Sequence, residues 1–320
     1  MRTRRWHPVD RLIGGWIRRI PEAKRMRVAR ILGVVKWSVL AGMAGLVLWQ
    51  QFGTPADGSP GPVRTELAEA EASAASTLAA SIKQTWNLEV RYQGDTSKFV
   101  LLVDHIPDGW RLDPIAAPDV LPALRAVSAA LSVYPTDFIR QHAGSEVGPI
   151  FLVRSIWVNG SEVGGMFMAG AIYVPARGMD ASASVTFAED TVHHEFALVG
   201  LYAGPSPKAA WAAANAPGFA YQTEHDAEAV RVAGHRPDAT DTSDGVHDAG
   251  FMIKYAESSL EEDWQTYAEQ AFGHPEALVA LVKRFPRVKA KAKIFIDHYG
   301  KLDPAFAAYF ARTGLEAAVG

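Results

Sequence analysis

The pattern of apolar and polar positions sets one long apolar run near the N-terminus apart from many shorter elements. Residues 31–50 read ILGVVKWSVLAGMAGLVLWQ, an apolar run whose one charge is Lys36. At a rise of about 1.5 Å per residue, such a helix spans a hydrocarbon core about 30 Å thick. Trp37 and Trp49 lie near its two ends, where amphipathic rings favour the membrane interface. The pattern therefore predicts one transmembrane helix.

The next part of the chain alternates between helical and extended patterns. Pro and Gly residues after the apolar run indicate a linker, and the Ala-rich stretch that follows is typical of a helix. Shorter apolar runs indicate strands, and one Leu/Val/Ala stretch has helical spacing. We expect a linker at 51–62, a helix at 63–86, strands at 87–92 and 98–103, and a helix at 119–133.

Two apolar runs, 150–158 and 165–174, flank the dipeptide Asn159-Gly160. Asn-Gly between apolar runs is a strong β-hairpin signal, although the link between these two runs is longer than two residues. The pattern predicts an edge hairpin over 150–174. An unpaired strand at 165–174 would leave a sheet edge beside the helix that follows.

Helical spacing dominates the rest of the chain. Ser259 followed by acidic residues is a good helix start. We expect helices at 184–200, 207–215 and 259–272, and two or three more within 274–318. The lysines of the last region are expected on a solvated face: Lys283, Lys289, Lys291 and Lys293. The whole pattern predicts an α+β fold with a small sheet and several helices.

Charge is distributed unevenly along the chain. Residues 1–36 carry eleven Lys and Arg against Asp10 and Glu22, a net charge of +9, whereas the whole chain carries −3. Residues 37–320 therefore carry −12, which argues against nucleic acid as a partner. The chain has no cysteine, which excludes disulfides, thiolate metal sites and lipid attachment through cysteine.

The basic N-terminal residues fit the positive-inside rule, which places them in the cytoplasm. We therefore expect a basic cytoplasmic tail at 1–30, a transmembrane helix at 31–50, a linker at 51–62 and an extracytoplasmic domain at 63–320. This arrangement is that of a single-pass protein of the bacterial inner membrane whose main domain faces the periplasm. The alternative is a cleaved signal peptide, but the basic region is long for one and no clear cleavage site follows Trp49.

One short segment carries the residue types of a zinc site. Residues 191–198 read TVHHEFAL on a predicted helix. In zinc peptidases with an H-E-x-x-H helix, two histidines one turn apart reach one metal ion, and the glutamate between them polarises its water. His194 and Glu195 supply the first half of this motif. The second histidine would fall at position 198, which is Leu198, so the motif is incomplete.

Two further segments extend the comparison. They read WAAANAPGFAY at 211–221 and YAESSLEEDWQTYAEQAF at 255–272. With the His-His-Glu-Phe segment before them, they resemble a bacterial group of zinc-binding metallopeptidases over roughly residues 130–300. The resemblance implies a zincin-like domain with Zn2+ as cofactor. It also implies His194 as a metal ligand, Glu195 as general base, and Glu262 or its neighbour Asp263 as a further ligand.

The missing histidine leaves open which residue completes the metal shell. His193 is adjacent to His194, but it points about 100° away on a helix. Asp190 lies one turn before His194, although a carboxylate there can also cap the helix. His225 and His247 lie in the loop between the motifs. The hydroxyl of Tyr255 or Tyr267 could donate a hydrogen bond to a developing oxyanion.

These expectations lead to a membrane-anchored zinc metallopeptidase, a hydrolase acting on a peptide or protein substrate in the bacterial envelope. The alternative is a catalytically degenerate zincin-like domain that binds an envelope partner, and the absent histidine favours it. A third reading is a structural domain without a binding groove. The acids at the start of the 259–272 helix are also favoured by the helix dipole, an account that is compatible with a ligand role.

Overall fold

The computed structural model describes residues 62–96, 99, 109–176, 185–223 and 238–320. The chain divides into two compact units, residues 1–66 and residues 67–320, and almost all described residues belong to the second. The predicted cytoplasmic tail and transmembrane helix lie outside the described residues. Among the helices that are described, none is long and apolar enough to cross a membrane.

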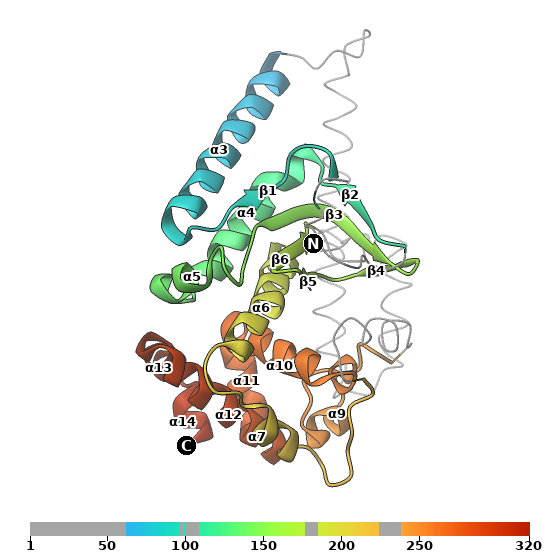
Figure 1. The fold of residues 1–320 in the computed structure, drawn as a ribbon, viewed down its shortest axis with the longest axis vertical. Coiled ribbons are helices and arrows are strands. Elements are labelled where there is room, and N and C mark those ends of the chain that lie inside the picture. Colours follow the sequence, from blue (N-terminus) through green and yellow to red (C-terminus); the bar gives the residue numbers. More distant parts are fainter. Residues whose placement is uncertain (1–61, 97–98, 100–108, 177–184, 224–237) are drawn as a thin grey trace, which may run out of the picture. The chain divides into compact units, whose positions relative to one another are not determined.

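The second unit has a mixed α+β fold, as the sequence predicted, with one small sheet and several helices (Figure 1). The strands are β1 (Val90–Arg91), β2 (Arg111–Pro114), β3 (Ile150–Val158), β4 (Ser161–Val163), β5 (Met166–Met168) and β6 (Ala171–Pro175). The helices up to residue 213 are α3 (Pro62–Trp86), α4 (Ala117–Ser132), α5 (Thr136–His142), α6 (Val185–Tyr202) and α7 (Lys208–Ala213). The later elements are α9 (Asp244–Ala249), the 3-10 turn η2 (Lys254–Glu257), α10 (Leu260–Ala268), the π-helical turn η3 (Glu269–Gly273), α11 (Pro275–Val282), α12 (Pro286–Leu302), α13 (Pro304–Arg312) and α14 (Leu315–Val319).

Strand β3 is the centre of the sheet. It pairs in parallel with β1 and β6 and antiparallel with β2 and β4, while β5 pairs antiparallel with β6 at the end of the strand order. Ile150 and Leu152 pack into the main core with α4 and α6, and Phe151 and Val153 pack into a smaller cluster on the opposite face. Because both faces are covered, β3 is a nearly continuous apolar run rather than an alternating one.

The predicted hairpin between 150–158 and 165–174 is wrong in its pairing. Asn159 and Gly160 both have positive φ, 51° and 81°, and form a two-residue turn that joins β3 to β4. A second turn at Ala169 and Gly170 joins β5 to β6. β6 thus returns parallel to β3, because the chain reverses twice rather than once.

Helix α6 does not end at Gly200, where the sequence predicted its end. It continues to Tyr202 and runs from the sheet to the C-terminal helices (Figure 1). A Cβ atom at position 200 would overlap the ring and hydroxyl of Tyr299 on α12. Glycine is therefore needed inside this helix for close helix packing, and it does not act as a stop signal there.

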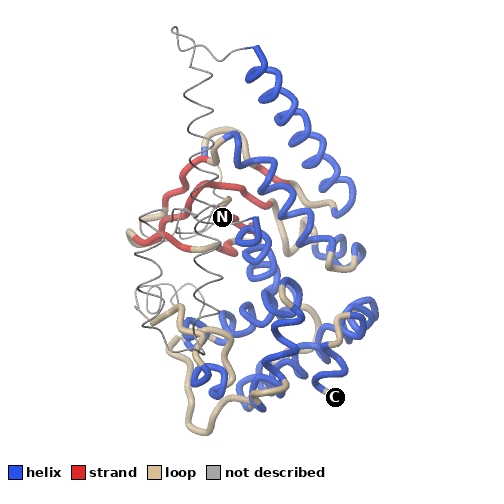
Figure 2. The backbone as a smooth tube through the Cα atoms, turned by 180° about the vertical axis from the view of Figure 1, so that it is seen from behind, coloured by secondary structure: helices blue, strands red, loops and turns tan. Residues whose placement is uncertain are grey.

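The C-terminal region forms four helices, not the two or three expected, and they gather in one cluster (Figure 2). Pro275, Pro286 and Pro304 each occupy the start of a helix, where proline costs no backbone hydrogen bond. Gly314, with φ of 78°, separates α13 from α14. These breakers explain the greater number of shorter helices.

Several smaller expectations also changed. The strand predicted at 87–92 is reduced to β1, and the strand predicted at 98–103 lies almost wholly outside the described residues. The sequence did not predict β2, α5 or α9. Lys291, expected on a solvated face, is fully buried and forms an ion pair with Asp263. An ion partner inside the protein replaces water for this ammonium group.

Candidate functional site

The candidate site lies where helix α6 packs against helix α10. The Ser259 side chain caps α10 by accepting a hydrogen bond of 3.1 Å from the backbone N–H of Glu262. Glu262 is therefore in the first turn of α10, and its carboxylate is nearly fully buried. Its Oε1 atom accepts a hydrogen bond of 2.7 Å from the hydroxyl of Tyr255, on the preceding turn η2.

The other oxygen of Glu262 faces His194. Oε2 lies 3.1 Å from Nε2 of His194, yet it makes no well-aligned hydrogen bond with any described residue. Two donors that bind one zinc ion tetrahedrally, each at about 2.0–2.2 Å, lie roughly 3.3 Å apart. The pair therefore has the separation of two metal ligands, and it also has the separation of a simple ion pair.

A third acidic residue, Glu269, completes the surroundings of His194. Its Oε1 lies 2.5 Å from Nδ1 of His194, on the opposite side of the imidazole ring from Glu262. A carboxylate on the far nitrogen fixes the ring orientation and raises the basicity of a metal-binding histidine. Sequence reasoning missed Glu269, although its spacing of seven residues from Glu262 is two helical turns and could have indicated it.

The carboxylates control the charge of His194. Burial alone would lower the pKa of His194, but the contacts with Glu262 and Glu269 outweigh burial and hold it well above its usual value. Without a metal, the ring therefore carries a positive charge at neutral pH. A cation bound at Nε2 would have to displace that proton.

Glu195 is buried beside this pair, under the connection between β4 and β5. Its Oε2 atom lies 3.4 Å from Nε2 of Gln265, and it accepts a backbone hydrogen bond from Phe167. A Cβ atom at Gly165 would lie only 2.5 Å from its Oε1. Burial, together with the charges of Glu262 and Glu269, raises the pKa of Glu195 to about 8 despite the attraction of His194. Such a value is typical of groups that exchange protons.

His193 lies in a different environment from His194. It is fully buried, and its Nδ1 atom is 3.1 Å from the hydroxyl of Tyr134. Burial lowers the pKa of His193 to about 3, so the ring is neutral. Asp190 is paired with His274 at 2.9 Å, near Glu269 but not on His194. The structure therefore does not bring His193 or Asp190 to the His194–Glu262 pair.

The other sequence candidates lie elsewhere. Leu198, in the place of the missing histidine, is nearly fully buried at 6% exposure. His247 Nδ1 hydrogen-bonds the carbonyl of Phe251 at 2.9 Å, and Tyr267 donates to the carbonyl of Gly250. His225 lies outside the described residues.

The donor set fits a metal ion in part. His194 Nε2 and Glu262 Oε2 face each other, and Glu262 Oε2 is a buried oxygen without an aligned donor. Catalytic zinc usually has three protein ligands. In the part of the chain that the structure describes, no group of three or more His, Asp or Glu side chains is arranged to hold a metal. Glu269 approaches His194 at the ring nitrogen opposite to the one that faces Glu262. The described residues therefore supply two facing donors, one fewer than the usual catalytic zinc site.

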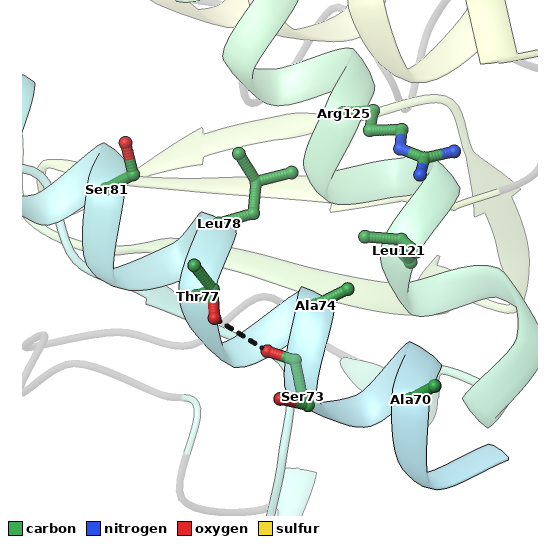
Figure 3. Close-up of a pocket in the computed structure, with 8 residues that line it drawn as sticks. All are labelled: Ala70, Ser73, Ala74, Thr77, Leu78, Ser81, Leu121 and Arg125. Carbon is green, nitrogen blue, oxygen red and sulfur yellow. Dashed lines mark hydrogen bonds between the residues drawn. The ribbon is translucent and has the colours of Figure 1, made fainter. Parts of the chain in front are cut away.

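A hollow of about 660 Å³ lies away from these residues, between α3 and α4 (Figure 3). Small and apolar side chains dominate its lining, and Arg125 is the charged residue among them. Figure 3 also shows the hydrogen bond of 2.9 Å from the Thr77 hydroxyl to the Ser73 carbonyl, within α3. The hydroxyls in its lining, those of Ser73, Thr77 and Ser81, have no His, Asp, Glu or Lys side chain beside them in the lining that could activate them.

In comparison with known proteins, the chain matches no family model, no curated protein and no solved structure. The likeness to zinc metallopeptidases thus rests on the three sequence motifs. Any function has to be argued from the chemistry of the site itself.

Proposed function

We propose that this chain is a membrane-anchored, zinc-dependent metallopeptidase of the bacterial envelope, with a zincin-like domain after its N-terminal helix. The observation that carries the proposal is the 3.1 Å approach of His194 Nε2 to Glu262 Oε2 from two separate helices. Glu195, the next residue after His194, has the raised pKa of a proton-transfer group. These are the residue types that the H-E-x-x-H motif and a later acidic helix supply in zincins.

In this proposal, His194 and Glu262 hold the ion, and Glu269 orients the imidazole ring through Nδ1. When bound, zinc supplies a Lewis acid that polarises a carbonyl and lowers the pKa of water. Tyr255 fixes the Glu262 carboxylate through its 2.7 Å hydrogen bond. Because tyrosine has a single O–H, the Tyr255 hydroxyl, the candidate donor to a developing oxyanion, would have to leave Glu262 to make that bond.

Glu195 is the candidate general base. With a pKa of about 8, it holds a proton at neutral pH in the metal-free protein. Its pKa would fall with a cation nearby, since opposite charge favours the ionised carboxylate. The carboxylate could then accept a proton during peptide hydrolysis.

Strand β5 is the proposed binding site for an extended peptide substrate. It lies at the end of the described strand order, and its three residues are half-buried. An edge strand can bind an extended peptide through backbone hydrogen bonds. The backbone of Phe167 in this strand also donates a hydrogen bond to Glu195, so the strand lies next to the candidate general base.

Zinc content of the full-length protein, purified in detergent and dialysed against a small excess of zinc, tests the proposal. We expect about one zinc per chain in the wild type and none in His194→Ala or Glu262→Ala. Glu261→Ala is the matched control, because Glu261 is equally buried but pairs with Lys208 at 2.6 Å. Glu195→Gln should keep zinc and lose hydrolysis of an unstructured protein such as casein. A wild type without zinc would overturn the proposal.

A binding protein is the second candidate, and one observation favours it. Leu198 buries an apolar side chain where a third ligand would stand, which leaves two protein donors among the described residues. On this reading, the same edge strand binds a peptide of an envelope partner without hydrolysing it. Absence of zinc, together with retained peptide binding in Glu195→Gln and Glu262→Gln, would establish this function instead.

A further inference from the structure

A second carboxylate on α10, that of Asp263, accepts hydrogen bonds from side chains of three other segments. Its Oδ2 atom accepts hydrogen bonds from Trp211 Nε1 at 2.8 Å and from Tyr221 Oη at 2.6 Å. The same atom lies 2.6 Å from the ammonium of Lys291 on α12. Asp263 and Lys291 are fully buried, and the ammonium lies 3.9 Å from the centre of the Phe251 ring. These contacts tie α10 to α12, to α7 and to the segment that follows α7.

Stability alone gives little reason for this network. Burial raises the pKa of Asp263 and lowers that of Lys291, so each charge is costly where it stands. A buried ion pair can often be replaced by apolar residues of similar volume with no loss of stability. A conformational role is the better-supported use of such a pair.

The position of Asp263 in α10 indicates what that role is. Asp263 directly follows Glu262, and successive residues of a helix point about 100° apart. Donors from three segments that converge on Asp263 therefore fix the rotation of α10 about its axis. That rotation decides whether Glu262 faces His194, which approaches it from α6.

We propose that the network of Asp263, Lys291, Trp211 and Tyr221 positions Glu262 toward His194. The inference rests on the proposed function, in which Glu262 is a metal ligand. None of the four touches His194, so they act through α10 and not on the ion or the substrate. The network also gives a physical reason why the tryptophan and tyrosine of 211–221 accompany the acidic helix: they bond to the residue next to Glu262.

Two double variants of the full-length protein separate positioning from stability. Asp263→Leu with Lys291→Met removes both charges and the acceptor, and leucine keeps the branching of aspartate. Asp263→Asn with Lys291→Met also removes both charges, but it retains an oxygen that can accept from Trp211 and Tyr221. Melting temperature and zinc affinity, measured by competition with a chelating dye, are compared with the wild type.

We expect the leucine variant to melt below the asparagine variant, because it leaves the buried donors of Trp211 and Tyr221 without an acceptor. Zinc affinity is therefore compared at a temperature at which both variants are folded. The leucine variant should bind zinc about 10- to 100-fold more weakly than the wild type, the range seen when outer residues of metal sites are lost. The asparagine variant should bind within about threefold of the wild type, because it keeps the acceptor. A folded leucine variant with wild-type zinc affinity would overturn the inference.

Two further measurements keep the test decisive. If the leucine variant does not fold, Tyr221→Phe removes one donor and leaves the charges paired, and unchanged zinc affinity in it would refute positioning. If the wild type binds no zinc, the proposed function fails by itself. Crystal structures of the metal-free wild type and asparagine and leucine variants then test positioning through the His194 Nε2 to Glu262 Oε2 separation. The separation should stay near 3.1 Å in the wild type and in the asparagine variant, and it should widen in the leucine variant. Equal separations in all three proteins would refute the inference.

Discussion

The Nε2 atom of His194 and the Oε2 atom of Glu262 lie 3.1 Å apart, on helices α6 and α10. The carboxylate of Glu269 hydrogen-bonds the other ring nitrogen, Nδ1, so carboxylates contact the imidazole on both sides. A histidine in this arrangement can exchange its Nε2 proton for a cation while Nδ1 stays fixed. For the proposed metal site, the number of protein ligands rather than their orientation is therefore what limits affinity.

Completing the ligand set should strengthen metal binding. Leu198 lies one helical turn after His194 on α6, the spacing at which two histidines reach one ion. We expect Leu198→His to raise zinc affinity at least about tenfold, since even an outer partner of a metal ligand is worth 10- to 100-fold. Competition with a chelating dye measures the change. Leu198→Asn, polar and of similar shape, is the control and should give no gain. No gain in Leu198→His would show that position 198 does not face the ion, and an equal gain in both variants would show that the imidazole is not its source.

Removing the negative charge from Glu269 should weaken the site without unfolding it. Glu269→Gln keeps the shape of the side chain but loses the charge that supports His194 through Nδ1. We expect zinc affinity to fall about 10- to 100-fold. Glu276→Gln, a change at an exposed carboxylate on α11, should leave the affinity as it is. Wild-type affinity in Glu269→Gln would mean that Nδ1 contributes nothing to metal binding.

The connection between β4 and β5 should tolerate alanine at one glycine and not at its neighbour. At Gly165, a Cβ atom would lie 2.5 Å from Glu195 Oε1 and from Thr191 Cγ2, whereas at Gly164 its nearest neighbour is Phe187 at 3.6 Å. We expect Gly165→Ala to lower the unfolding free energy by about 1–3 kcal/mol, as overpacking does. Gly164→Ala should change it by less than about 0.5 kcal/mol. Equal melting temperatures for the two variants would contradict the close approach of this connection to Glu195.

Asp190 should make the stability of the domain fall as pH rises through the acidic range. Burial, with the nearby charges of Glu269 and Glu189, raises its pKa to about 6 against the attraction of His274. The folded state therefore keeps a proton that the unfolded chain releases near pH 4, and stability declines between about pH 4 and pH 6. The decline amounts to at most about 2–3 kcal/mol, since one pKa unit is worth about 1.4 kcal/mol.

Asp190→Asn tests this pH dependence because asparagine stays neutral and can still accept from His274. The melting temperature of the variant, relative to the wild type, should rise from pH 4 to pH 6.5 and then level off. Asp137→Asn, at an exposed carboxylate on α5, provides the control and should show no such trend. A difference between Asp190→Asn and the wild type that is the same at every pH would rule out a titrating Asp190.

Local sequence signals determined much of the secondary structure. The Ala-rich helix, the apolar run of β3 and the Ser259 cap of α10 follow from patterns that act over a few residues. The prolines that begin α11, α12 and α13 were equally readable as helix starts. The sequence likewise pointed to His194 and Glu195 through residue type and spacing, and the family resemblance pointed to Glu262 or Asp263.

Only the tertiary structure decided which residues meet. The parallel pairing of β3 with β6 depends on two successive turns, and the continuation of α6 past Gly200 depends on the ring of Tyr299. Lys291 resembles its solvated neighbours in sequence, and burial against Asp263 sets it apart. Glu269 reaches His194, and Glu262 rather than Asp263 faces it, because of how α10 is rotated against α6. Such contacts join residues far apart in the chain. Spacing can place Glu262 and Glu269 on one face of a helix, but it does not say which residue of another element that face meets.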